Sequence, residues 1–188
     1  LRARLGGVAC GLWLTERVWE PSLVLPLKSA GVEYLMVDDA HFLAAGLNPD
    51  RLWNYWLTED QGETLAVWPI SQRLRYLIPF EPPEKTIEYL RGLASQGKNR
   101  VALLADDGEK FGVWPDTFRQ VYENGWLEKF FGLVEDNADW LRMELPGSVT
   151  RSRPPEGRIY LPTASYSEMM EWALPATEQI EFHAFREK

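Results

Sequence analysis

Acidic residues follow three separate apolar runs of the sequence. The runs span residues 12–15, 34–37 and 101–105, and the acids that follow them are Glu16, Asp38, Asp39, Asp106 and Asp107. Short apolar runs predict buried strands, and in parallel α/β folds the carboxyl ends of such strands line the site. We therefore expect these acids to converge on one cleft.

Carboxylates gathered in this way could cleave a glycosidic bond. That reaction needs one ionised carboxylate facing the anomeric carbon and one protonated acid facing the leaving oxygen. A neighbouring acid raises the pKa of its partner, as an acid catalyst at neutral pH requires. Flat rings beside the acids would hold the sugar, and the candidates are Trp13, Trp19 and Trp114. For each acid taken singly, a helix-capping role remains the alternative.

His41 follows Asp39 by two residues, so a metal site is a second hypothesis. It would combine Asp38 or Asp39 with His41, but the other histidine, His183, lies far away in the last predicted helix. A hydrogen bond from His41 to a sugar hydroxyl or a carboxylate is therefore favoured. The single cysteine, Cys10, excludes an internal disulfide and a cysteine-rich zinc site, and we interpret it as a packed thiol.

Strand and helix patterns alternate along the chain, which indicates βαβ units and a parallel sheet. Strands are expected over residues 8–14, 34–37, 65–68, 74–78, 101–105 and 159–161. Helices are expected over about 21–30, 83–94, 115–134 with a break at Gly125, 165–172 and 176–188. The stretch 46–62 is interpreted as an excursion over a site, and 146–157 as a loop or linker.

Composition narrows the class of protein. A chain of 188 residues is long enough for one domain that buries roughly 70% of its unfolded surface. Its net charge of −8 repels phosphates and anionic lipids, so neither nucleic acid nor a membrane is an expected partner. Nine tryptophans suggest either sugar stacking or a tryptophan-rich core. The expected compartment is the reducing cytoplasm.

Two long motifs resemble those of glycoside hydrolase family 57. Residues 9–21, ACGLWLTERVWEP, resemble its nucleophile motif, and residues 106–115, DDGEKFGVWP, resemble its acid/base motif. Residues 37–42, 74–80 and 160–166 are also similar to its 4-α-glucanotransferase and α-amylase subgroup. The resemblance implies a (β/α)₇ barrel, of which this chain would be the central and C-terminal part, with a helical region over about 115–188.

The resemblance also implies roles for individual residues. Glu16 would be the nucleophile of a retaining 4-α-glucanotransferase, and Asp107, two residues before Glu109, its general acid/base. An α-amylase-type hydrolase would use the same pair. The expected substrate contacts are Trp13, Trp19, Asp39, His41, Asp106 and Trp114. The implied partner is an α-glucan, with a homodimer for the full-length protein and no metal or organic cofactor.

Several segments of the family pattern have no counterpart in this sequence. They are the His-Gln-Pro motif, the second and last motifs, the early barrel strands and the C-terminal β-sandwich. The sequence also has no initiator methionine, so we expect a fragment of the catalytic domain. A non-catalytic glucan-binding fragment and a metal-dependent carbohydrate deacetylase using His41 remain as alternatives.

Overall fold

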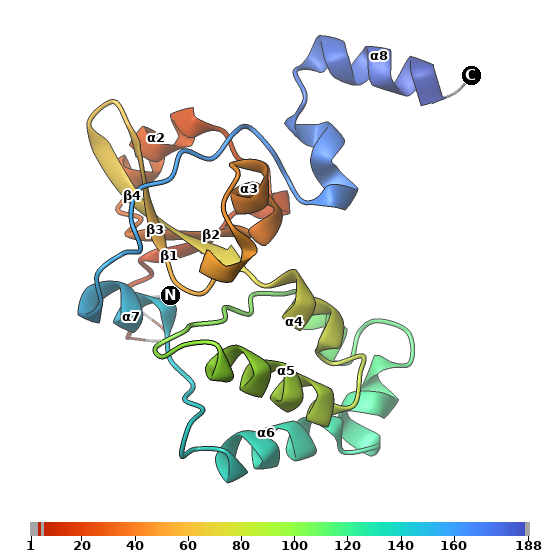
Figure 1. The fold of residues 1–188 in the computed structure, drawn as a ribbon. Coiled ribbons are helices and arrows are strands. Elements are labelled where there is room, and N and C mark those ends of the chain that lie inside the picture. Colours follow the sequence, from red (N-terminus) through yellow and green to blue (C-terminus); the bar gives the residue numbers. More distant parts are fainter. Residues whose placement is uncertain (1–3, 5, 187–188) are drawn as a thin grey trace. The chain divides into compact units, whose positions relative to one another are not determined.

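The computed structural model describes residue 4 and residues 6–186, and it divides the chain into two compact units (Figure 1). The first unit combines Leu1–Ile70 with Leu145–Lys188, and the second is Ser71–Glu144. In the described part of the chain, no helix combines the length and apolar character needed to cross a membrane. The last two residues of the helix expected over 176–188 lie outside the described residues.

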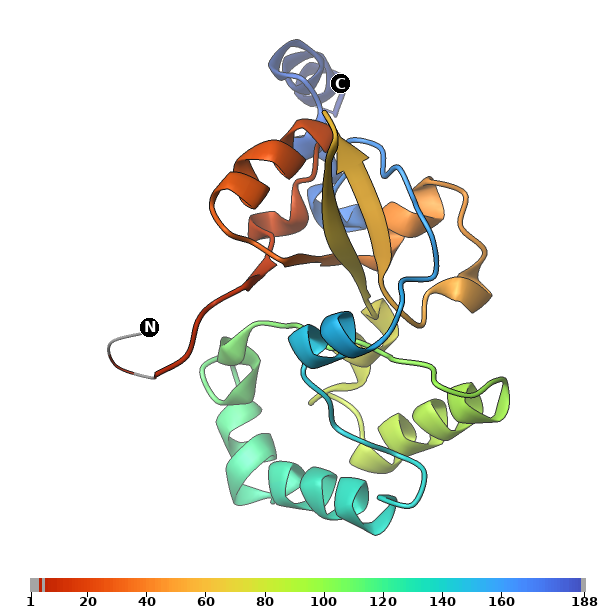
Figure 2. The same cartoon turned by 90° about the vertical axis from the view of Figure 1, so that its left-hand side faces the viewer.

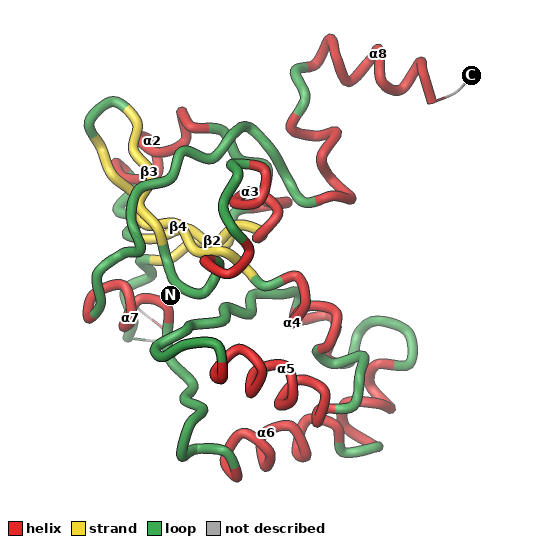
Figure 3. The backbone as a smooth tube through the Cα atoms, viewed as in Figure 1, coloured by secondary structure: helices red, strands yellow, loops and turns green. Residues whose placement is uncertain are grey.

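A four-stranded mixed sheet organises the first unit (Figure 3). Strands β1 (Gly11–Trp13), β2 (Tyr34–Asp38) and β4 (Glu63–Ile70) run parallel, which confirms the strands expected at 34–37 and 65–68. The first expected strand, 8–14, is shortened to β1. β3 (Trp56–Asp60) pairs antiparallel with β4, giving the order β1-β2-β4-β3.

The antiparallel β3 corrects two predictions, a wholly parallel sheet and an excursion over 46–62. A two-residue turn, Gln61–Gly62, joins β3 directly to β4. Both turn residues have positive φ, 51° and 83°, the conformation that matches the twist of a tight hairpin. The stretch 46–62 therefore contributes an edge strand to the sheet.

Helices surround this sheet (Figure 2). The predicted helix at 21–30 is confirmed as a 3₁₀ turn, η2 (Pro21–Leu23), followed by α2 (Val24–Ser29). Figure 2 shows α2 and α3 (Asp39–Ala44) on opposite sides of the β3–β4 hairpin. The remaining elements of this unit are η1 (Thr15–Arg17), η3 (Pro49–Arg51), α7 (Pro146–Ser152), η6 (Ser167–Ala173) and α8 (Ala176–Arg186).

Two further predictions for the first unit are wrong. Residues 146–157, interpreted as a linker, begin with α7, because Pro146 stands at the first helical position, where its missing N–H costs nothing. Residues 159–161 form no strand, and their neighbour Arg158 makes a single parallel bridge with Leu57.

The second unit is helical. Its elements are α4 (Gln72–Leu77), α5 (Pro83–Ser95), η4 (Gly108–Phe111), the π-helix η5 (Arg119–Glu123) and α6 (Trp126–Asp136). The predictions at 83–94 and 115–134 are confirmed, and Gly125 separates η5 from α6 with a positive φ of 71°.

Two strands predicted in this unit are not formed. Residues 74–78 lie in or next to α4, whose N-terminus is capped by Ser71: its side-chain oxygen accepts from the Leu74 N–H at 3.3 Å. The apolar residues 74, 77 and 78 have helical spacing, which the strand interpretation overlooked. Residues 101–105 form no named strand, although the carbonyl of Leu103 accepts from the Ser71 N–H.

Tryptophan contributes to the core of both units. Trp19, Trp56 and Trp68 are buried in the first unit, and Trp126 is buried in the second. Trp126 stacks on Phe130 with ring centroids 5.1 Å apart. Much of the tryptophan excess thus serves the core, and Trp114 and Trp172 are the ones that stand exposed.

Candidate active site

Glu16 follows β1 on a strained turn. Its φ and ψ are 47° and 12°, and Arg17 also has a positive φ, 51°. Neither residue is glycine, so each such conformation costs on the order of 1–3 kcal/mol. The turn persists only because surrounding contacts hold it.

Those contacts come from residues 164–166, far along the chain. The Ser165 hydroxyl donates to the Glu16 carbonyl oxygen at 2.6 Å. The Tyr166 hydroxyl donates to Oε2 of the Glu16 carboxylate at 3.1 Å, across 150 positions of sequence. Trp19 and Ala164 exchange backbone hydrogen bonds. The 164–166 segment therefore holds both the backbone and the side chain of Glu16.

Arg17 packs against the face of the Tyr166 ring. Its guanidinium carbon lies 3.6 Å from the Tyr166 ring centroid and 5.4 Å from that of Trp13. The Arg17 side chain is buried, and its Nε and the buried indole Nε1 of Trp13 find no hydrogen-bond partner among the residues that the structure describes. Buried donors without partners are costly, so these two stand out beside Glu16.

The protonation of Tyr166 suits its role as a donor. Burial raises the pKa of its hydroxyl, and the positive charge of Arg17 opposes this. The hydrogen bond to Glu16 and the charge of that carboxylate raise the pKa further. The hydroxyl therefore keeps its proton at neutral pH and donates to Glu16.

Two predicted substrate contacts, Trp19 and His41, lie in the core instead. Trp19 is fully buried, and its Nε1 donates to the Leu161 carbonyl at 3.2 Å. His41 is also fully buried, with Nδ1 3.0 Å from the Asp38 carbonyl oxygen and Nε2 2.8 Å from that of Arg17. A ring enclosed in this way has no face for a sugar, so we assign both residues a structural role. His41 braces the same turn that carries Glu16.

Asp38 and Asp39 stand at the start of α3. Asp38 is buried, and its Oδ1 accepts from the Ala40 N–H at 3.2 Å, so the capping alternative holds for this residue. Asp39 is the first residue of the helix and is half-buried. Among residue 4 and residues 6–186, no three His, Cys, Asp or Glu side chains gather as metal ligands would.

In the second unit, Asp106 is enclosed by cations. Its side chain is only 4% exposed, and it forms ion pairs with Arg75 at 3.4 Å and with Lys110. Oδ1 also accepts from the Asp107 N–H at 3.0 Å. These partners occupy the carboxylate, so the predicted substrate contact is replaced by a structural role that fixes the backbone of Asp107.

Asp107 and Trp114 are more accessible. Asp107 is half-buried and makes no capping hydrogen bond to the 3₁₀ turn η4 that follows it. Trp114 is 39% exposed and stacks on Phe80, with centroids 6.1 Å apart and an interplanar angle of 19°. The Lys110 ammonium lies 5.6 Å from the Trp114 ring. Lys110 therefore links the Asp106 ion pairs to the aromatic pair.

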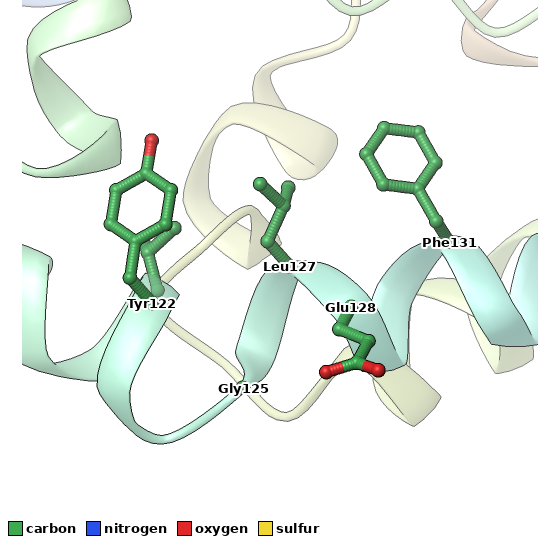
Figure 4. Close-up of a pocket in the computed structure, with 6 residues that line it drawn as sticks. Tyr122, Gly125, Leu127, Glu128 and Phe131 are labelled. Atoms are coloured by element: carbon green, nitrogen blue, oxygen red, sulfur yellow. The ribbon is translucent and has the colours of Figure 1, made fainter.

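An open, apolar hollow of about 360 Å³ lies elsewhere in the second unit (Figure 4). It is lined by Val121, Tyr122, Gly125, Leu127, Glu128 and Phe131. Figure 4 shows the rings of Tyr122 and Phe131 on the same side as Leu127, with the Glu128 carboxylate directed away. These lining residues differ from the predicted site residues Asp107 and Trp114.

Several residues that the sequence motifs do not single out surround Glu16 and Asp106 in this structure. They are Arg17, Arg75, Lys110, Ser165 and Tyr166. The i, i+4 spacing of Asp106 and Lys110 was a usable local signal. No local signal connects Tyr166 with Glu16.

Comparisons with known proteins identify the family. Residues 1–162 match the family model described as "Glycosyl hydrolase family 57". The chain is 52% identical over 185 residues to "Alpha-amylase 1" of Dictyoglomus thermophilum, covering 98% of this chain and 27% of that protein. It is 50% identical over 185 residues to a 4-alpha-glucanotransferase of Thermococcus litoralis, covering 98% of this chain and 28% of that protein.

Two solved structures are similar in fold to this chain. The crystal structure of the Thermococcus litoralis 4-alpha-glucanotransferase matches with a TM-score of 0.87 and 50% identity over 97% of this chain and 29% of that one. A GH57-type branching enzyme of Pyrococcus horikoshii shares the fold, with a TM-score of 0.62 and 16% identity over 94% of this chain and 44% of that one. The chain spans little more than a quarter of the length of its curated relatives. It belongs to glycosyl hydrolase family 57.

Proposed function

We propose that the protein is a retaining 4-α-glucanotransferase acting on α-1,4-glucans, with an α-amylase-type hydrolase as the alternative. Relatives at about 50% identity carry both names, which supports this pair of activities. The observation that carries the proposal is the strained, tethered carboxylate of Glu16. Strain of this kind collects at functional sites, because folding alone gives no reason to keep it.

In the proposed mechanism, Glu16 attacks the anomeric carbon and Asp107 donates a proton to the leaving glucosidic oxygen. The bond to that oxygen breaks, and a covalent glycosyl-enzyme forms with inverted configuration. Asp107, now ionised, then takes a proton from an incoming hydroxyl, which attacks the same carbon and releases Glu16. A sugar hydroxyl as acceptor gives transfer, and water gives hydrolysis.

We also propose that the parallel strands β1, β2 and β4 belong to a (β/α)₇ barrel. The proposed compartment of the protein is the reducing cytoplasm. The order strand β1, helix α2 and parallel strand β2 is a βα repeat, which supports this architecture. Of the six expected substrate contacts, Trp13, Asp39 and Trp114 remain as proposed contacts. The half-buried ring of Trp13 and the exposed, stacked ring of Trp114 each offer aromatic surface to a sugar face.

Product analysis tests this function. The chain is incubated with a single maltooligosaccharide, and Glu16→Gln is compared with Glu20→Gln. Glu20 is an apt control because it is an exposed glutamate of the same motif, and its Oε1 accepts from the neighbouring Ser22 hydroxyl at 2.7 Å. Products both longer and shorter than the substrate, lost in Glu16→Gln and kept in Glu20→Gln, are expected.

Other outcomes decide between the alternatives. Shorter products alone would assign the same residues to a hydrolase. Full turnover by Glu16→Gln would contradict the proposed nucleophile. Binding of the oligosaccharide without turnover, unaffected by Glu16→Gln, would identify a non-catalytic glucan-binding chain.

A further inference from the structure

We propose that Tyr166 is the positioning residue of the nucleophile: it holds one oxygen of the Glu16 carboxylate and leaves the other to attack. This inference rests on the proposed function, since it assumes that Glu16 is the nucleophile. It adds a residue that lies outside both catalytic motifs of the sequence.

The first argument is the anchoring of the segment that carries Tyr166. Ala164 and Ser165 are 3% and 0% exposed, so this part of the chain is fixed in the core of the first unit. The carbonyl of Ala164 lies 3.1 Å from Nε2 of the buried His41. Ser165 donates to the backbone of Glu16 from the same place. The tyrosine that follows therefore starts from a rigid base.

The second argument is the fixed orientation of the tyrosine ring. The Arg17 guanidinium carbon lies 3.6 Å from the ring centroid, a cation–π contact made by a side chain that is itself buried. Arg17 and Glu16 are adjacent on the strained turn. The residue next to the nucleophile thus holds the ring whose hydroxyl holds the nucleophile.

The third argument is chemical. A carboxylate at the end of a glutamate side chain has free torsions, and attack needs one oxygen in line with the anomeric carbon. The Tyr166 hydroxyl at 3.1 Å from Oε2 removes much of that freedom and leaves Oε1 for the reaction. Misplacement of a reacting group by about 1 Å can cost about 100-fold in rate. We therefore expect a loss in kcat of about 10- to 100-fold without the hydroxyl.

Kinetics of Tyr166→Phe test this role. The matched control is Tyr160→Phe, which also removes a hydroxyl that donates to a glutamate, here Oε2 of Glu59 at 3.2 Å on an exposed surface. Tyr166→Phe is expected to lower kcat with little change in KM for the maltooligosaccharide, and Tyr160→Phe to change neither. Thermal melts of both variants serve as the control that each is folded at the assay temperature. Equal kcat values for the two variants would overturn the proposal.

A titration tests the contact without any turnover. The groups that face the Tyr166 hydroxyl are Arg17, which lowers its pKa, and Glu16, which raises it. NMR of ¹³Cζ-labelled tyrosine, with the signal assigned from Tyr166→Phe, should show a lower Tyr166 pKa in Glu16→Gln than in the parent chain. Glu20→Gln should leave it unchanged. An identical pKa in all three chains would overturn the contact and with it the proposal.

The two tests separate this inference from the proposed function. If Glu16→Gln is inactive and Tyr166→Phe is as active as Tyr160→Phe, the nucleophile stands and only the positioning role fails. If Glu16→Gln remains active, the proposed function fails. If the parent chain shows no turnover, the titration alone decides whether Tyr166 holds Glu16.

Discussion

The two units hold their candidate carboxylates in opposite ways. Glu16 stands on a strained backbone kept in place by two neutral donors about 150 positions away, Ser165 and Tyr166. Asp107 stands on an unstrained extended backbone, with φ −67° and ψ 127°, next to a buried carboxylate paired with two cations. The first arrangement depends on contacts between the two sequence segments of the first unit, and the second on two cations within the second unit, one four and one 31 positions from Asp106.

This difference has a chemical counterpart in the proposed mechanism. A nucleophile must be oriented toward the anomeric carbon, and the hydrogen bonds from Ser165 and Tyr166 restrict the orientation of Glu16. A general acid/base must gain and lose a proton; the Asp107 carboxyl group makes no capping hydrogen bond to η4, while Asp106 holds the Asp107 backbone. Three substitutions sharpen or break the comparison.

The largest effect is expected for Asp107→Asn. General acid/base catalysis contributes about 10²–10⁴-fold, and the amide can neither donate the proton nor take it back. Added azide, which needs no base, should restore turnover of a substrate with an activated leaving group. Rates with and without azide provide the measurement.

Asp116→Asn is the control for this substitution. Asp116 is exposed and has a positive φ of 62°, a conformation that asparagine adopts readily. Its activity should stay at the parental level. A rate for Asp107→Asn equal to that of this control would remove Asp107 from the mechanism.

Lys110→Met is expected to destabilise the protein by about 3–5 kcal/mol, because it leaves Asp106 buried with one of its two cations. Both side chains of this pair are nearly inaccessible, 5% and 4% exposed. The control, Lys129→Met, removes an ion pair with Glu84 that is 57% and 50% exposed. Such surface pairs contribute about 0–1 kcal/mol. Urea unfolding followed by fluorescence measures both, and equal losses would refute the buried network.

The smallest of the three effects is expected for Ser165→Ala. It deletes the hydrogen bond to the Glu16 carbonyl from a fully buried side chain, at a cost of about 1–2 kcal/mol. Ser167→Ala, which loses only an exposed bond to Glu168, should cost little. Denaturant unfolding gives the energies, and faster amide exchange around Glu16 in Ser165→Ala alone would show that the turn has loosened. Unchanged exchange would mean that the strain is held elsewhere.

Local sequence patterns were sufficient to predict the helices that begin at a proline and end near a glycine. Pro21 and Gly31 bound the first helix, and Pro83 and Gly97 frame α5. They were insufficient where several structures share one pattern. The apolar residues of 74–78 suit a strand or a helix, and the Ser71 cap decides for the helix.

For the candidate site, the sequence by itself determined the motifs, and with them the family and the expected roles of Glu16 and Asp107. It could not separate accessible side chains from enclosed ones. Trp13 and Trp19 belong to one motif, yet Trp13 is half-buried while Trp19 is fully buried in the core. Only packing decides which ring a substrate can reach.

The tertiary structure alone decided how Glu16 is held. Its positive φ is unfavourable for an isolated chain, so no local preference predicts it. The compensating bonds come from Ser165 and Tyr166, which reach Glu16 only when the sheet and core of the first unit bring both segments together. The positive φ of Glu16 and the hydrogen bonds that compensate for it are therefore properties of the folded chain, because no local sequence pattern specifies either.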